Sequence, residues 1–320
     1  MKLWVKVAVS ASLLALLFVL LPWHDVRDAF SRLPLSVWAL VLAGFLLGHQ
    51  VGVVKWRLLV NAGNASLRLI DATRCYAAGL FANLCLPSIV GGDVLRAALA
   101  GKATGRAEAA LMGGVADRAI DIVTMCVLIA GGTLMIGGQL SGEWRMIAPA
   151  ILFLGVMGLL AAMPFVLRRP LTWWPRRVRR PLGRSLVALR RLLRDRRAAA
   201  IALLLSLIIQ SSFVVLNYWI GRAVGVETTL AVWFLVWPLA KVAGLLPISL
   251  GGLAVRDATL GALLLPFGVP LARGVVAALV WQTVMIAGGL VAGVVWWALA
   301  QKRHVTSELP SAALAARTIR

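Results

Sequence analysis

The stretch Leu86–Leu99, LPSIVGGDVLRAAL, occurs a second time at Leu246–Leu260 as LPISLGGLAVRDATL. A Leu-Pro pair, a Gly-Gly pair and an arginine recur in register, displaced by half of the 320-residue chain. Proline lacks the backbone N–H and glycine loses much backbone entropy, so both are poor residues for a helix interior. Because both copies lie within long apolar runs, they predict two broken helices at corresponding places in an internally duplicated membrane protein. The alternative is a chance match of small residues that let helices pack closely.

The composition is that of a membrane protein. The chain is 61% hydrophobic and 14% charged, with a mean hydropathy of +0.90, whereas a soluble domain is about 45–50% apolar and 25% charged. The net charge of +21 comes mostly from arginines in loops and at segment ends. This placement fits the excess of basic residues in cytoplasmic loops and argues against a nucleic-acid partner. The three cysteines and three histidines are scattered, so neither a metal site nor a cofactor is expected.

The apolar runs predict an all-α polytopic fold with about six full transmembrane helices and two re-entrant helical hairpins. Lys55-Trp56-Arg57 follows one of the spans and has the aromatic and basic character of a membrane-boundary anchor. The six spans are expected at about residues 3–21, 35–54, 109–136, 146–167, 198–220 and 275–300.

The distribution of basic residues supports the hairpins. Tyr76–Leu86 contains 11 uncharged residues, which as a helix measure about 16 Å, or half of a 30 Å hydrocarbon core. If this segment crossed the membrane, the block of 12 arginines between Arg168 and Arg197 would face outward. If residues 76–100 instead enter from the cytoplasm and return, and the second hairpin enters from outside, all basic segments and both termini are cytoplasmic.

This arrangement gives each half of the chain three crossings and one hairpin. An odd number of crossings places the halves in opposite orientations, which is the inverted-repeat plan of secondary transporters. We expect a single transmembrane domain over 1–320, with repeat one at about 1–140 and repeat two at about 145–300. Irregular backbone at membrane depth requires a covering of protein or a water-filled cavity, so a cavity is expected between the hairpin tips.

Two basic segments lie outside the predicted spans. Residues 168–197 form a basic cytoplasmic interfacial segment, in which Leu182, Leu186, Leu189 and Leu193 recur at helical spacing and arginines occupy the other faces. Residues 301–320 are expected to form a flexible basic tail.

Ionisable residues within apolar sequence are the candidate binding site, because such groups are costly in a bilayer and line a pathway or pair with one another. Arg96 and Arg256 are predicted to bind an anionic phosphate head group through their planar guanidinium groups, with glycine N–H groups at the helix breaks assisting. A structural ion-pair network is the open alternative. The candidate substrate-binding residues are Asn83, Pro87, Gly91, Gly92, Asp93, Arg96, Asp117, Arg118, Asp121, Lys241, Pro247, Gly251, Gly252, Arg256 and Asp257.

These residues resemble the lysylphosphatidylglycerol synthase transmembrane-region family, whose members are flippase-like membrane proteins. The resemblance rests on Asn83, on Pro87 with Gly91-Gly92-Asp93 and Arg96, on Asp117-Arg118, and on the second motif from Leu246 to Arg256. The second motif departs from the family pattern in Leu253-Ala254-Val255-Arg256-Asp257. The resemblance implies a bacterial or archaeal inner-membrane protein that moves or binds lipid head groups. The chain ends shortly after its last predicted span, so the aminoacyl-transferase domain of better-known members is expected to be absent, and the chain itself is not expected to be an enzyme.

Three functions therefore stay open. The first is a lipid flippase or transporter for an anionic, aminoacylated or glycosylated lipid. The second is a membrane subunit that recruits a soluble lipid-modifying enzyme through the arginine block. The third is an intramembrane enzyme acting on a polyprenyl-phosphate lipid, with Asp93, Asp117 and Asp121 as its acids or bases.

Overall fold

The computed structural model describes residues 33–85, 91–137, 176–244 and 253–315, together with the single positions 27 and 31. The described residues form helices and no strand, as the sequence predicts. The predicted spans at 3–21 and 146–167 lie outside them, and so do four candidate site residues: Pro87, Pro247, Gly251 and Gly252.

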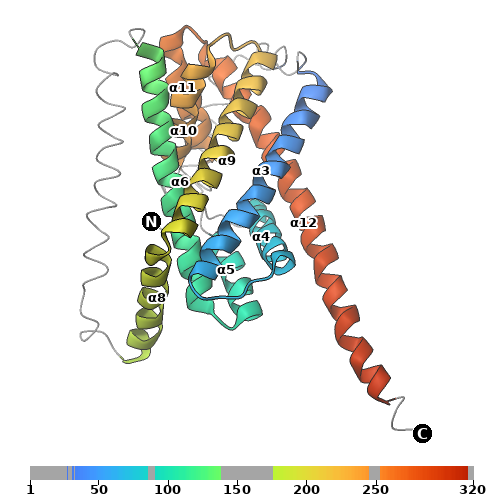
Figure 1. Cartoon of the computed structure of the whole chain (residues 1–320). Coiled ribbons are helices and arrows are strands. Elements are labelled where there is room, and N and C mark those ends of the chain that lie inside the picture. The colour runs from blue at the N-terminus through green and yellow to red at the C-terminus, as the bar shows by residue number, and fades with distance from the viewer. Residues whose placement is uncertain are drawn as a thin grey trace.

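Four helices in the described part of the chain are long and apolar enough to cross a membrane. They are α3 (Leu35–Ala62), α6 (Ala107–Ile136), α9 (Arg196–Ala223) and α12 (Leu271–Ala315, of which Leu271–Gln301 is the apolar part). In Figure 1, α3 and α12 run from top to bottom, whereas α6 and α9 run from bottom to top. The protein is therefore a polytopic, membrane-embedded helical bundle.

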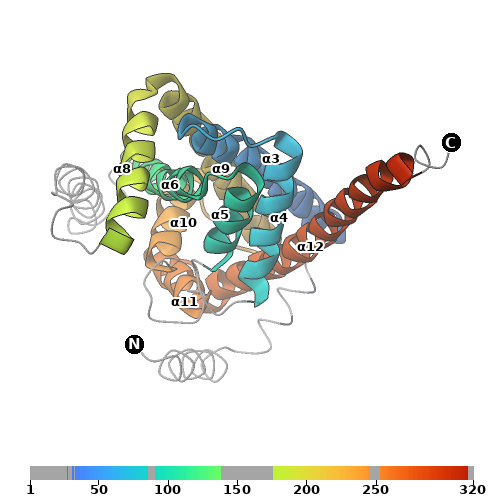
Figure 2. The ribbon, with the colours of Figure 1, turned by 90° about the horizontal axis from the view of Figure 1, so that it is seen from below.

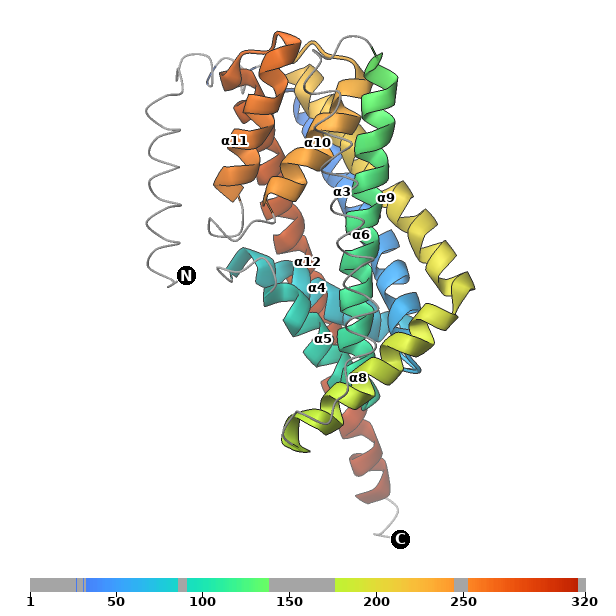
Figure 3. The ribbon, with the colours of Figure 1, turned by 90° about the vertical axis from the view of Figure 1, so that its left-hand side faces the viewer.

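Two pairs of short helices accompany the long ones. The first pair is α4 (Leu69–Cys85) and α5 (Gly91–Thr104). The second is α10 (Leu230–Gly244) and α11 (Leu253–Leu264), which ends in the short helix η4 (Leu265–Phe267). The partners within each pair pack against each other, and Figure 3 shows the first pair in the lower half of the bundle and the second in the upper half. These pairs occupy the segments that the sequence predicts as hairpins.

Each half of the chain packs a long helix against the pair of short helices of the other half. Helix α6 packs along α10, and α12 packs along α4. A Cβ added to Gly132 of α6 would lie 2.6 Å from the backbone nitrogen of Leu235 in α10, and one added to Gly289 of α12 would lie 2.6 Å from Leu84 in α4. Small residues therefore let each hairpin approach the last long helix of the opposite half.

Helix α8 (Arg176–Arg194) belongs to the basic segment. Seen from below in Figure 2, α8 lies along one side of the bundle beside α6. Leu186 and Leu192 are buried against the bundle, whereas Leu193 is 38% exposed. The side chain of Asp195 accepts a hydrogen bond from the backbone N–H of Ala198 (2.9 Å) and caps α9.

The expected basic tail begins within the last helix. Helix α12 continues to Ala315 and projects away from the bundle.

Candidate functional site

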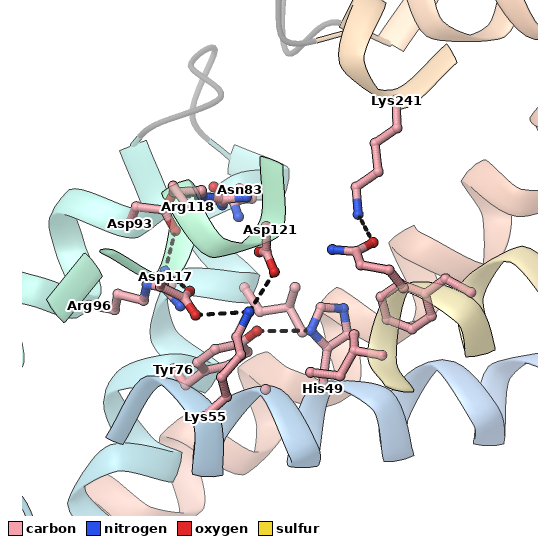
Figure 4. A pocket seen from close by; sticks show the side chains of 16 residues that line it. His49, Lys55, Tyr76, Asn83, Asp93, Arg96, Asp117, Arg118, Asp121 and Lys241 are labelled. Atoms are coloured by element: carbon pink, nitrogen blue, oxygen red, sulfur yellow. Dashed lines mark hydrogen bonds and ion pairs between the residues drawn. The ribbon is translucent and has the colours of Figure 1, made fainter. Parts of the chain in front are cut away.

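A polar cavity of about 100 Å³ lies between the helices of both halves. It receives side chains from α3, α4, α5, α6, α9 and α10, and Figure 4 shows them converging. Its lining residues are His49, Gly52, Lys55, Tyr76, Gly79, Leu80, Asn83, Asp93, Arg96, Asp117, Arg118, Asp121, Ile209, Gln210, Phe213 and Lys241. Seven of the predicted site residues are therefore brought together: Asn83, Asp93, Arg96, Asp117, Arg118, Asp121 and Lys241.

The centre of the site is a buried ion-pair network. The ammonium group of Lys55 on α3 lies 3.0 Å from Asp117 Oδ1 and 2.5 Å from Asp121 Oδ1. The two aspartates are one helical turn apart on α6, so both face α3, as their spacing predicts. Asp121 also accepts a hydrogen bond from the hydroxyl of Ser206 on α9 (2.7 Å). Lys55 thus links α3 to α6 through charges that are shielded from solvent.

The network continues through two arginines. Arg96 Nη2 on α5 lies 2.8 Å from Asp117 Oδ2 and 3.2 Å from Asp93 Oδ1. Arg118 Nη2 lies 2.6 Å from Asp93 Oδ2. The side chain of Arg96 is 5% exposed, whereas that of Arg118 is 44% exposed. Arg96 is therefore a buried structural link, whereas Arg118, which also lines the cavity, is the more exposed of the two.

Aromatic rings cover the buried guanidinium. The Cζ atom of Arg96 lies 5.1 Å from the ring centroids of both Trp56 and Tyr76, within the range of a cation–π contact. The Tyr76 hydroxyl also lies 3.3 Å from His49 Nδ1. The first hairpin is thereby joined to α3 through polar as well as apolar contacts.

The backbone amide of Gly92 is used internally, contrary to the prediction of an accessible anion-binding group. Its N–H donates to Oδ1 of Asn83 across the hairpin (3.1 Å). A Cβ at Gly92 would overlap the carbonyl oxygen of Gly79, and a Cβ at Gly79 would lie 2.7 Å from the carbonyl oxygen of Gly92. Gly92 is thus required for the close approach of α4 and α5, while Gly91 starts α5 and does not line the cavity.

Arg256 and Asp257 form a separate buried cluster and do not line the cavity. Arg256 donates through Nε and Nη2 to Asp257 Oδ1 (2.9 and 2.7 Å) and through Nη2 to Gln282 Oε1 on α12 (2.9 Å). Its Cζ lies 5.9 Å from the ring of Trp237. Arg256 is thus held by its own neighbours, and it does not share the cavity that Arg96 lines.

Sequence reasoning missed Lys55 and Gln210 as site residues. Lys55 lies just after the predicted span, but α3 continues to Ala62, and the Lys55 side chain is only 4% exposed. Gln210 on α9 accepts a hydrogen bond from Lys241 Nζ (2.8 Å). One signal for Lys55 was present in the sequence. A buried lysine requires carboxylate partners, and the apolar segment at 109–136 contains two aspartates, Asp117 and Asp121.

The site offers charged and hydrogen-bonding groups for a polar ligand. Among the described residues, no three His, Cys, Asp or Glu side chains gather in a way that could hold a metal ion. The groups that face the cavity are instead ammonium, guanidinium, carboxylate and amide groups from both halves. Such a set is suited to a charged group that enters the bundle from its membrane surroundings.

Comparison with known proteins agrees with these features. The family model for the lysylphosphatidylglycerol synthase TM region matches residues 3–308. No curated protein and no solved structure matches the chain in the corresponding comparisons. The match spans nearly the whole chain, so the protein belongs to the lysylphosphatidylglycerol synthase transmembrane-region family.

Proposed function

We propose that the protein is a lipid flippase or transporter of the cell (inner) membrane, which binds an anionic, aminoacylated or glycosylated head group in the polar cavity. The observation that carries the proposal is the convergence of four basic and three acidic side chains on one cavity inside an apolar bundle. Ionisable groups in a membrane interior mark substrate pathways or ion pairs, and here a cavity adjoins the pairs. In this proposal the chain moves the lipid and does not modify it.

The proposal includes an inverted repeat with two re-entrant hairpins and six full spans. Helices α3 and α9 occupy corresponding places in the two halves and run in opposite directions, as do α6 and α12 (Figure 1). In each hairpin, an arginine of the second helix packs over an aromatic ring of the first: Arg96 over Tyr76, and Arg256 over Trp237. These correspondences support two halves related by rotation about an axis in the membrane plane.

A reconstitution assay tests the transport function. Liposomes that contain the protein should expose a head-group-labelled anionic phospholipid of the inner leaflet to an outside quencher faster than protein-free liposomes. Arg118→Gln should slow this movement about tenfold or more, because a charge-assisted hydrogen bond is worth about 1.5–3 kcal/mol. Asp93 keeps Arg96 as a partner at 3.2 Å, so the variant should fold.

The matched control is Arg106→Gln, which removes an exposed arginine outside the cavity and should leave the rate unchanged. Wild-type protein that moves the labelled lipid no faster than empty liposomes would refute the transport function.

Topology follows from the same proposal, with both termini and α8 in the cytoplasm. In a Cys85→Ser background, which removes the exposed native thiol, Arg191→Cys in α8 should react with a membrane-impermeant maleimide only from the cytoplasmic side. Glu227→Cys, which is exposed in the segment before α10, should react only from outside. Reaction of both cysteines from the same side would contradict the orientation.

The exposed arginines of α8 support a second candidate function, the recruitment of a lipid-modifying enzyme. The side chain of Arg184 is 74% exposed, although it lies 3.2 Å from Glu108. Arg190, Arg191 and Arg194 of α8 are exposed as well, and so are Arg196 and Arg197 at the start of α9. Replacing Arg191 and Arg194 together by Gln should abolish binding of such an enzyme without slowing lipid movement if recruitment is the role of α8.

A further inference from the structure

We propose that a phosphate group binds in the cavity between Lys241 and Arg118, and that it thereby joins the second hairpin to the ion-pair network of the first half. The inference rests on the proposed function, because it specifies the ligand chemistry of the same cavity. It assigns the anion-binding role to Lys241, a side chain of α10 in the second half of the chain, and to the exposed arginine of α6.

The charges around the cavity do not balance. The basic side chains are Lys55, Arg96, Arg118 and Lys241, and the carboxylates are those of Asp93, Asp117 and Asp121. With these groups ionised, four positive and three negative charges leave one positive charge in excess. An uncompensated charge in a membrane-embedded cavity is costly, so the site is suited to one additional anion.

The excess charge can be assigned to Lys241. The three carboxylates are engaged by Lys55, Arg96 and Arg118 at 2.5–3.2 Å. The hydrogen-bond partner of Lys241 is the neutral amide of Gln210, at 2.8 Å, and none of the described carboxylates lies within ion-pair distance of its ammonium group.

The sequence adds an independent argument. The segments that connect the helices of the two hairpins, residues 86–90 and 245–252, contain no acidic residue. Neither connection can therefore supply the missing carboxylate. An ammonium group has three N–H donors, and the amide of Gln210 accepts from one of them.

The geometry places a second donor across the cavity. Figure 4 shows Lys241 entering from α10, with the carboxylate network and Arg118 on the facing side. The Arg118 side chain is 44% exposed, compared with 4–5% for Lys55 and Arg96. A lysine acts on phosphate as a point charge and an arginine as a fork, so the pair provides both kinds of contact.

The size of the cavity restricts the ligand. A volume of about 100 Å³ is well below the roughly 300–1,000 Å³ of pockets that enclose whole small molecules. It can accommodate a phosphate group but not a complete lipid. The phosphate can belong to a phospholipid head group or to a free inorganic ion, and these two sources are separated by experiment.

Binding would connect parts of the protein that come from different halves. Lys241 belongs to α10, whereas Arg118 and its partner Asp93 belong to α6 and α5. A phosphate held by Lys241 and Arg118 therefore bridges the second hairpin to the network of the first half.

Binding is tested with purified full-length protein in nanodiscs. Discs of neutral phosphatidylcholine are titrated with phosphatidylglycerol in one arm and with inorganic phosphate in the other, and affinity is measured by the shift in the thermal unfolding midpoint. Lys241→Gln should weaken binding about 10- to 100-fold, since one charge-assisted contact is lost. Lys102→Gln, the same change at an exposed lysine outside the cavity, should have no effect.

The outcomes separate the possibilities. Saturable binding in the phosphatidylglycerol arm assigns a lipid head group, and binding of inorganic phosphate alone assigns a free anion. Unchanged affinity of Lys241→Gln in both arms overturns the inference. If this variant also moves lipid at the wild-type rate, the transport function stands while the phosphate site fails. If the wild-type protein moves no lipid, the transport function fails, and the titration still tests the phosphate site.

A second measurement uses the wild-type protein and tests the proposal even if Lys241→Gln does not fold. Lysine acylation of the wild-type protein, followed by peptide mass spectrometry, should show Lys241 protected by the ligand that binds, with Lys102 as the unprotected reference. Equal labelling of Lys241 with and without ligand overturns the proposal.

Discussion

Replacing Lys55 by Met should destabilise the protein by about 3–5 kcal/mol, because it leaves two carboxylates buried without their shared cation. Lys55 lies 3.0 Å from Asp117 and 2.5 Å from Asp121, whose side chains are 5% and 14% exposed. Asp117 keeps Arg96 as a partner, whereas Asp121 keeps the hydroxyl of Ser206. The measurement is the thermal unfolding midpoint in detergent, which should fall well below that of the wild type.

Two further variants test the cause of this loss. Lys55→Met combined with Asp121→Asn should recover part of the stability, since the stranded charge is removed together with its partner. Lys102→Met, at an exposed site on α5, should change stability by no more than about 0.5 kcal/mol. If Lys55→Met unfolds at the wild-type temperature, the ion-pair network does not hold α3 against α6.

Gly92→Ala should separate the two helices of the first hairpin. The added Cβ would overlap the carbonyl oxygen of Gly79 and Oδ1 of Asn83, and the carbonyl belongs to a helix backbone that cannot rotate away. Overpacking of this kind costs about 1–3 kcal/mol or more. The hydrogen bond from Gly92 N–H to Asn83 should be lost as well. A lowered thermal midpoint together with faster hydrogen exchange in α4 and α5 would report the separation.

Gly114→Ala on α6 is the matched control for this substitution. A Cβ at Gly114 meets no atom within 4 Å, and alanine is favoured over glycine in a helix by about 1 kcal/mol. This variant should be as stable as the wild type or slightly more so. If Gly92→Ala behaves like Gly114→Ala, the close contact of α4 with α5 is not required.

Much of the site could be predicted from sequence because charges are conspicuous in apolar segments. Asp93, Arg96, Asp117 and Asp121 were identified in this way, and the structure brings them to one cavity. Their pairing was not predictable in the same way. Arg118 lies three residues before Asp121 on α6, a spacing that permits an ion pair, but it pairs with Asp93 on α5. The spacing of residues along one helix shows which side chains share a face, whereas their ion-pair partners depend on how several helices pack together.

The roles of Lys55 and Gly92 were not predicted correctly, and the reason is the same for both. Lys55 stands beside Trp56 and Arg57, and this triplet has the composition of a membrane boundary. Its carboxylate partners, however, belong to α6, the third helix after α3 in the order of the chain. Gly92 was expected to offer a free amide, but Asn83 accepts its hydrogen bond. In both cases the missing information was which distant side chain faces the residue, and no pattern within a short window contains it.

The reciprocal packing of the hairpins affects how the chain is made. Helix α4 ends at Cys85, whereas α12, which packs along it, begins only at Leu271. At a synthesis rate of about 5–20 residues per second, the ribosome needs roughly 10–40 s to cover that distance. During this interval the first hairpin is without its partner helix, and its polar backbone ends and charged side chains must be sheltered in another way. Completion of the bundle is therefore a late, whole-chain event, and neither half should mature when it is produced alone.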